Sequence, residues 1–463
     1  MHVLLISTYD LGRQPFGLAS PAAWLRAAGA EVECVDTSRV ELNDQQIEAA
    51  SLIAFYLPMH TATRLAAPLI ERTRRVNPLA RLSAYGLYAP LNAGWLRERG
   101  VTEIIGPEAE AELVGLISPK VESFTISTGE SQLSTLNRTG LAPTKLRFIK
   151  PDRAGLPALE QYASLHMPDG SRRIMGSSDA TRGCKHLCRH CPIVPVYQGQ
   201  FRVVPLDVVM EDVRGQVAAG AQHISFADPD FLNGPTHARR LVERFHGEWP
   251  DISYDVTIKI EHLLSHADVV PILRDTGCLF ITSAVEAIDD VVLGHLVKGH
   301  TRADFIKVAG LCRDAGVTLM PTFVPFTPWT TLAGYVELLD VLEDLDLVEQ
   351  VAPIQLAIRL LVTSGSPLLE LSDIRVAVAP FDPASLTWPW RHCDPAVDVL
   401  QLEVMQLVGG NSGALRAEVF AAISALAREH AGLPLRSNRP ARGKPVPFVS
   451  EPWYCCAEPM ESL

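Results

Sequence analysis

Short apolar runs alternate with amphipathic stretches through the first 120 residues of the chain. The stretches at 15–28 and 62–75 have the spacing of helices. The apolar runs lie at 3–8, 32–35, 51–57, 80–84 and 103–105. Strands that are apolar on both sides must be covered on both faces, which is typical of a parallel sheet between two layers of helices. Residues 1–120 are therefore predicted to form a doubly wound α/β domain that binds ligands at the carboxyl ends of its strands.

A second α/β pattern follows a polar, proline-containing connector at 121–170. Its apolar runs predict six strands, at 174–178, 223–227, 254–260, 279–285, 318–324 and 353–358. Helical stretches lie between them, near 206–219, 236–246, 265–276, 302–315 and 331–345. Repeating βα units of roughly 30 residues predict a partial (β/α)6 barrel over 171–365, with its working face at the carboxyl ends of the strands. Residues 366–463 are predicted to form a C-terminal helical region, with a helical stretch over 397–430.

The composition is that of an ordinary globular protein of 463 residues, with 47% hydrophobic and 20% charged positions. The 41 basic and 53 acidic residues give a formal charge of −12, so the sequence lacks the broad basic balance of a nucleic-acid-binding protein. The N-terminus has no signal-peptide pattern, and no apolar run reaches about 18 residues. We expect a cytoplasmic protein that binds neither membrane nor nucleic acid. Nine cysteines, an odd number without a dense framework, are expected to be mostly reduced thiols.

Three of these cysteines form a C-x3-C-x2-C cluster, Cys184, Cys188 and Cys191, directly after the first strand of the second pattern. Three thiolates from one short loop can bind three corners of an iron–sulfur cube and leave the fourth iron open. A closed zinc site is the alternative, with His186 or His190 as the fourth ligand. A loop on the active face of a barrel is a poor place for a purely structural metal, which favours the iron–sulfur interpretation.

The cluster resembles the cysteine motif of the radical S-adenosylmethionine (SAM) superfamily over about residues 173–361. The resemblance implies a 4Fe-4S cluster whose open iron chelates SAM, and a 5′-deoxyadenosyl radical formed by reductive cleavage. It also implies an unidentified small-molecule substrate and an electron donor such as flavodoxin or ferredoxin. His190 stands where the family usually has an aromatic residue.

Further residues fit the same family at successive strand ends. Asp228 and Asp230 stand where the family receives the ammonium group of SAM, and Glu286 where a carboxylate holds the ribose. Lys298 begins a Lys-Gly-His-Thr segment typical of the subgroup with an N-terminal cobalamin-type domain. Each carboxylate has a plain alternative as a solvated strand end or a helix cap.

Two charged residues within apolar strands are additional candidates. Lys259 lies close to Glu261, and Arg359 lies four residues after Gln355 on the predicted sixth strand. Charges on the inner face of a barrel must be paired or must bind something. They either form structural Lys–Glu and Arg–Asp pairs or bind the carboxylate of SAM or an anionic substrate. The aromatic loop at 321–329 is a candidate wall that excludes water from a radical, or only a hydrophobic contact.

The N-terminal domain resembles that of the cobalamin-binding subgroup, most of whose members transfer methyl groups. No Gly-x-Gly-x-x-Gly follows the first strand, which disfavours a dinucleotide site. The Asp-x-His-x-x-Gly signature of cobalt ligation is also missing, so a form with a histidine on cobalt has no support. Met59 or His60 are candidates to approach the cobalt, although packing suits either side chain better. The domain is predicted either to bind cobalamin or only to pack against the barrel.

The chain ends in Trp453-Tyr-Cys455-Cys456-Ala-Glu458-Pro459, which resembles the tail of the CUAEP/CCAEP-tail radical SAM proteins. Some members of that family carry selenocysteine at the second cysteine position. Adjacent soft nucleophiles suit redox chemistry or a soft metal, so Cys455 and Cys456 are predicted to act in catalysis. The alternative is a tail with incidental thiols.

The sequence thus predicts a radical SAM enzyme, and the resemblance to the cobalamin-binding subgroup implies cobalamin-dependent methyl transfer. Two alternatives stay open. One is a cobalamin-independent radical SAM enzyme that forms or rearranges C–S, C–Se or C–As bonds. The other is a non-catalytic zinc or metalloid sensor, in which the central cysteines bind zinc.

Overall fold

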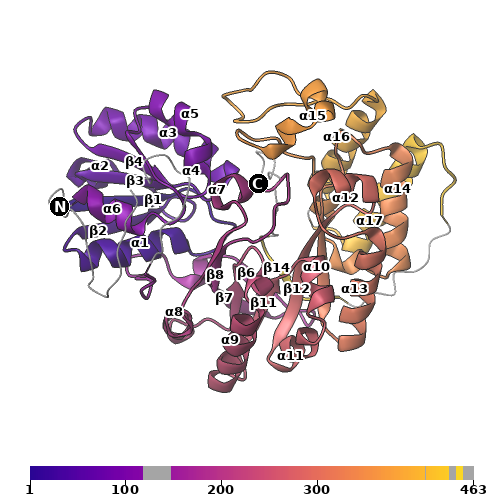
Figure 1. The fold of residues 1–463 in the computed structure, drawn as a ribbon, viewed down its shortest axis with the longest axis horizontal. Coiled ribbons are helices and arrows are strands. Elements are labelled where there is room, and N and C mark those ends of the chain that lie inside the picture. Colours follow the sequence, from indigo (N-terminus) through magenta and orange to yellow (C-terminus); the bar gives the residue numbers. More distant parts are fainter. Residues whose placement is uncertain (118–146, 412, 437–444, 452–463) are drawn as a thin grey trace.

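The computed structural model describes residues 1–117, 147–411, 413–436 and 445–451. Two larger β-sheets lie side by side (Figure 1). The N-terminal sheet is drawn in indigo, and the central sheet continues into orange helices. The predicted fold class, a doubly wound parallel sheet followed by a partial barrel and helices, is confirmed.

The N-terminal sheet has five parallel strands in the order β2-β1-β3-β4-β5. The strands are β1 (His2–Ser7), β2 (Glu31–Asp36), β3 (Leu52–Tyr56), β4 (Arg81–Tyr85) and β5 (Glu103–Ile104). The helices are α1 (Phe16–Ala27), α2 (Asp44–Ala49), α3 (His60–Val76), α4 (Tyr88–Leu91), α5 (Ala93–Glu98) and α6 (Glu110–Ile117). All five predicted strands are therefore confirmed.

Alternate residues of β1 belong to two separate cores. Leu4 and Ile6 pack in the cluster that contains Ile70 of α3, whereas Val3 and Leu5 pack with Leu18 of α1. Side chains of a strand point alternately to opposite faces, so a continuous apolar run serves a sheet that is covered twice. Because β1 is buried on both faces, it could be recognised in the sequence as a continuous apolar run.

The central sheet has seven strands in the order β13-β12-β11-β10-β7-β6-β14. Five of them are parallel: β7 (Arg172–Ser178), β10 (His223–Phe226), β11 (Ser253–Thr257), β12 (Cys278–Glu286) and β13 (Thr318–Phe323). Two short antiparallel strands extend the other edge, β6 (Ser164–His166) and β14 (Phe448–Val449). The sequence pattern predicted neither of these two edge strands.

Helices follow the parallel strands and cover the central sheet. They are α8 (Leu206–Ala218), α9 (Pro235–Glu248), α10 (Ile260–Ser265), α11 (Val269–Asp275), α12 (Asp290–Leu296), α13 (Arg302–Ala315) and α14 (Leu332–Asp344). The C-terminal region adds α15 (Ser372–Ala377), α16 (Pro395–Gly410) and α17 (Arg416–His430). The helical stretch predicted over 397–430 is thus two helices, and both share one core with the barrel through residues such as Leu400 and Ile423. Within the described ranges, no helix has the length and apolarity that a membrane crossing needs.

The predicted sixth strand at 353–358 is wrong. Residues Pro353–Leu356 form a 3-10 turn, and the side-chain oxygen of Gln355 accepts a hydrogen bond from the backbone N–H of Phe323, at 3.2 Å. A side chain thus satisfies an edge donor of β13 that a sixth strand would otherwise satisfy. Parallel pairing persists only as a bridge between Phe326 and Arg359. The apolar run was misread because an apolar run alone does not distinguish a strand from a buried turn.

A buried ion pair joins the N-terminal domain to the barrel. Arg182, in the short strand β8 (Thr181–Gly183), lies 2.7 Å from Glu110 of α6, and Ser20 of α1 donates to the same carboxylate at 2.6 Å. Arg182 also lies over the rings of Phe16 and Phe148, 5.1 Å from each centroid. Because removing one partner of such a pair strands a buried charge, this contact fixes the two domains relative to each other.

The N-terminal domain also contacts the C-terminal region. The indole N–H of Trp95 donates to the carbonyl of Pro383 at 3.0 Å, and Leu386 belongs to the same core as β1 and β3. His60 is buried against the ring of Tyr88, and the backbone of Ser385 interacts with its imidazole. Its place in this packing interface supports the packing role considered for His60.

This interface should weaken in acid. Burial, with Arg64 nearby, lowers the pKa of His60 from its ordinary 6.5 to about 4. The stability that neutral His60 contributes is present above pH 6.5 and is lost as the pH falls from 6.5 toward 4, because only the unfolded chain then binds the proton. Between about pH 7.5 and pH 5, the free energy of unfolding of the wild-type protein should fall by about 2 kcal/mol more than that of His60→Gln, as measured by thermal unfolding. Equal losses in the two proteins would contradict this assignment.

Candidate functional site

The three clustered cysteines lie in one loop between β8 and the short helix α7 (Val194–Tyr197), at the carboxyl end of the barrel strands. Cys184 and Cys188 are buried and Cys191 is partly exposed, and all three are free thiols. Burial raises the pKa of Cys184 to about 12, and Asp230 and the other two thiols add to the effect. Three thiols this close become thiolates only with a compensating positive charge, as a bound metal provides.

Asp228 and Asn233, which both follow β10, form hydrogen bonds with the backbone at the start of this loop. Asp228 accepts hydrogen bonds from the N–H groups of Ala180, at 2.9 Å, and Thr181. Asn233 accepts from the N–H of Lys185 at 3.2 Å and donates to the carbonyl of Gly183. Burial raises the pKa of Asp228 well above its usual range, and these backbone donors oppose the shift. One oxygen of Asp228 therefore positions the cysteine loop.

Asp230 binds the middle of the loop. One of its oxygens lies 3.2 Å from Nε2 of His186 and 2.7 Å from Nδ1 of His262, a residue of α10. The carboxylate is fully buried, which favours a raised pKa, but the two histidines outweigh burial and lower it. Asp230 thus connects the cysteine loop to α10. His262 was not predicted from the sequence, because a lone histidine in a helix carries no spacing signal.

Glu286, at the end of β12, holds the last part of the loop. Its Oε1 lies 3.1 Å from Nε2 of His190 and 3.3 Å from Nζ of Lys298. Burial alone would raise the pKa of Glu286, but Lys298 and His190 outweigh it and lower the pKa to about 2. Burial lowers the pKa of His190 itself, so the charged partner is Lys298. The histidine that replaces the usual aromatic residue is therefore a partner of Glu286.

The second oxygen of Glu286, Oε2, is buried and has no hydrogen-bond partner among the described residues. The backbone of Glu286 also has a positive φ of 70°, in the left-handed region that suits glycine. Such strain persists only where the surroundings impose it, and it is concentrated at functional sites. An oriented acceptor without a donor is what a bound hydroxyl group would satisfy.

The other predicted charges lie in structural pairs. Lys259, at the start of α10, has its ammonium 3.4 Å from Oε2 of Glu261. Arg359 lies 2.7 Å from Asp398, donates to the carbonyl of Trp390 and stacks 3.5 Å from the ring of that tryptophan. Lys259 is beside the cysteine loop, whereas Arg359 belongs to the contact with α16. Cys455 and Cys456 lie outside the described residues.

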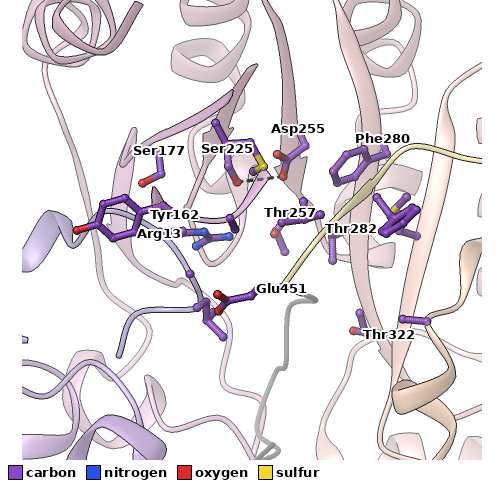
Figure 2. A pocket seen from close by; sticks show the side chains of 18 of the residues that line it. Arg13, Tyr162, Ser177, Ser225, Asp255, Thr257, Phe280, Thr282, Thr322 and Glu451 are labelled. Atoms are coloured by element: carbon purple, nitrogen blue, oxygen red, sulfur yellow. Dashed lines mark hydrogen bonds between the residues drawn. The ribbon is translucent and has the colours of Figure 1, made fainter. Parts of the chain in front are cut away.

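A pocket with a cavity volume of about 90 Å³ opens between the inner face of the barrel and the N-terminal domain. Figure 2 shows its strand side chains, from Ser177 of β7 through Ser225, Asp255 and Phe280 to Thr322 of β13. Arg13, of the loop after β1, lines it from the N-terminal domain, and Glu451 from the end of the described chain. Residues from the barrel, the N-terminal domain and the end of the described chain thus meet at this pocket.

A second hollow, with a cavity volume of about 440 Å³, lies at the carboxyl ends of β1 and β2. It is lined by residues that follow these strands, such as Thr8 and Ser38, and by α3. No histidine, cysteine or methionine is among its lining residues. This is the edge at which doubly wound sheets bind ligands.

Residues 179–342 match the family model of the radical SAM superfamily and thus form a radical SAM domain, as the cysteine motif predicted. Two curated proteins are each 25% identical to the chain. The ribosomal protein uS12 methylthiotransferase RimO of Parabacteroides distasonis aligns over 177 residues, 35% of this chain. The tRNA-2-methylthio-N(6)-dimethylallyladenosine synthase of Fusobacterium nucleatum aligns over 183, 36% of this chain. The match covers about 40% of the length of either relative.

Two solved structures share the architecture of most of the chain. The radical SAM methyltransferase TsrM of Kitasatospora setae, with cobalamin and a [4Fe-4S] cluster bound, has a TM-score of 0.61 and 17% identity, over 93% of this chain and 99% of TsrM. The cobalamin-dependent radical SAM enzyme OxsB, with aqua-cobalamin bound, has a TM-score of 0.69 and 14% identity, over 89% and 67%. At these identities the likeness is one of fold.

The buried pair of Glu286 and Lys298 predicts a double-mutant result. Glu286→Gln leaves Lys298 without this counter-charge, which should destabilise the protein by about 3–5 kcal/mol. Glu286→Gln combined with Lys298→Met removes both charges and should restore part of the loss. Differential scanning fluorimetry of the two singles and the double tests this, and strictly additive losses would show that the pair is not coupled.

Proposed function

We propose that this protein is a radical SAM enzyme that binds a [4Fe-4S] cluster on Cys184, Cys188 and Cys191. It cleaves SAM reductively and uses the radical on a small molecule, with methyl transfer that depends on cobalamin. The observation that carries the proposal is the three-thiol loop at the carboxyl ends of the strands in a radical SAM domain. When bound and reduced, such a cluster supplies a 5′-deoxyadenosyl radical from SAM.

The surroundings of the loop support a cluster rather than zinc. A zinc site would need a fourth ligand. The two candidate imidazoles each have one ring nitrogen beside a carboxylate: His186 contacts Asp230 and His190 contacts Glu286. Three thiols from one loop of a radical SAM domain fit a cluster that keeps one iron open for SAM.

Three buried groups around the loop are proposed to hold SAM. The Oε2 atom of Glu286 is an acceptor without a protein donor, which suits the ribose hydroxyls. Lys259 and Asp230 have opposite charges at the rim of the loop and suit the carboxylate and ammonium groups. Asp228 and Lys298 are proposed to act without contacting SAM. Asp228 positions the cysteine loop, and Lys298 positions the carboxylate of Glu286.

The N-terminal hollow at the ends of β1 and β2 is the proposed cobalamin site. Its lining residues provide hydroxyls rather than a histidine, cysteine or methionine ligand for cobalt. His60 is buried against Tyr88 and is not offered to this hollow. These lining residues would therefore hold a cobalamin without a histidine ligand from this chain.

The two tail thiols are proposed to act at this same pocket. Glu451 lines the pocket and is fixed by Arg39 at 2.8 Å, directly after β14 pairs with β6. Cys455 follows four residues later, so covalent geometry keeps it within about 14 Å of Glu451. This reach supports a role for Cys455 and Cys456 beside the substrate, as a hydrogen donor or a thiol ligand.

The cluster assignment predicts the outcome of single thiol removal. Cys188→Ala should abolish bound iron, acid-labile sulfide and 5′-deoxyadenosine formation after anaerobic reconstitution. Cys312→Ala, which removes a buried thiol in α13, is the matched control and should retain all three. Stoichiometric zinc without sulfide in the wild-type protein, or continued SAM cleavage by Cys188→Ala, would refute the proposal.

The tail assignment predicts a distance. A nitroxide label on Cys456, in a variant with Cys455→Ala and Cys393→Ser, should relax faster when the cluster is reduced to its paramagnetic state. A label on Asp275→Cys, at the exposed end of α11 near the start of β12, lies at the opposite end of the strands and should not respond. Equal relaxation at both positions would exclude the tail from the site.

A further inference from the structure

The pocket contains one carboxylate that the proposed SAM and cluster residues do not use. Asp255 lies on β11, in the inward series with Thr257, and is 5% exposed. It lies four residues before Lys259, so it is about 13 Å below the rim at which SAM is proposed to bind. In Figure 2 its side chain faces the pocket beside Ser225.

Neighbouring side chains hold this carboxylate in one orientation. Nε2 of His223 lies 2.9 Å from Oδ1 of Asp255, and the hydroxyl of Ser225 donates to Oδ2 at 3.2 Å. Both contacts come from β10, the strand paired with β11. A carboxylate has about four lone-pair directions, so two remain for a group in the pocket.

A hydrogen-bond chain sets the direction of the His223 contact. Arg173, which can only donate, donates to the hydroxyl oxygen of Ser253 at 2.7 Å, and that hydroxyl lies 2.8 Å from Nδ1 of His223. The hydroxyl of Ser253 can then donate to Nδ1, which is the arrangement that leaves the ring proton on Nε2, facing Asp255. In this tautomer Asp255 acts as a hydrogen-bond acceptor.

Four charged residues line the pocket: Asp255 and Glu451 are acidic, and Arg13 and Arg416 are basic. Glu451 is paired with Arg39, and Arg416 donates to the carbonyl of Glu349 while lying over Phe448. Among the described residues, neither lysine nor arginine pairs with Asp255. An oriented carboxylate in a lumen walled by Phe280 and threonines favours a ligand cation.

We propose that this pocket binds the substrate through a cationic nitrogen, an amine or a related group, that hydrogen-bonds to Asp255. The inference deepens the proposed function and rests on it, because it names the substrate class of the same site. The aromatic ring of Phe280 and the hydroxyls of Thr257 and Thr282 then surround the rest of the molecule. His223 is a positioning residue that keeps the carboxylate turned toward the pocket.

The test compares two probes of similar size, phenethylamine and 3-phenylpropan-1-ol, by isothermal titration calorimetry. The reconstituted full-length enzyme is used with saturating SAM and no reductant, so the SAM site is filled. Wild-type protein should bind the amine at least tenfold more tightly than the alcohol, since a charge-assisted hydrogen bond is lost in the alcohol. Asp255→Asn, which keeps the shape of the side chain, should reduce this preference to within about twofold.

Asp207→Asn, an exposed carboxylate of α8 that pairs with Arg244, is the matched control and should keep the wild-type preference. Equal binding of amine and alcohol by the wild-type protein, or no binding of either, overturns the proposal without any variant. A preference that survives in Asp255→Asn overturns it as well. Formation of 5′-deoxyadenosine from SAM is measured on the same samples with reductant. SAM cleavage without an amine preference refutes the proposed substrate class but not the proposed radical SAM function.

Discussion

The organisation of the site depends on buried carboxylates at the ends of two barrel strands. The cysteine loop has few regular hydrogen bonds of its own, so its polar groups need partners from elsewhere. Asp228 and Asp230 after β10 and Glu286 at the end of β12 provide them. Each contacts a different part of the loop: the backbone before Cys184, His186 and His190.

These contacts also relate the loop to the N-terminal domain. Arg182 lies two residues before Cys184 and is held by Glu110 and Ser20 of the N-terminal domain. The strand that enters the cysteine loop is therefore fixed from both sides, by the barrel and by the doubly wound sheet. A cofactor on the N-terminal sheet and a cluster on the loop would share this rigid connection.

The parts of the fold that the sequence predicted are those with a simple burial pattern. β1 is apolar along its length because Leu4 and Val3 face different cores. The 3-10 turn around Gln355 was missed because one side-chain hydrogen bond to Phe323 decides it. β6 and β14 were missed since two or three residues carry no periodicity.

The same distinction applies to the site. Cys184, Cys188 and Cys191 were predicted from their spacing, and Glu286 from the resemblance to the radical SAM family. His262 and the chain from Arg173 to Asp255 depend on contacts between residues far apart in sequence, and no local pattern records them. The charged residue inside an apolar strand at Asp255 was the available signal, and the direction of its side chain required the fold.

The pairing of β14 with β6 has a consequence for how the molecule is made. Leu165 and Val449 are neighbours in the sheet although almost three hundred residues separate them in the sequence. During synthesis β6 emerges early, and its outer edge stays open until β14 has also been made. An open edge is a template for pairing with other chains. β14 thus covers an edge that would otherwise stay exposed while the residues between the two strands are made.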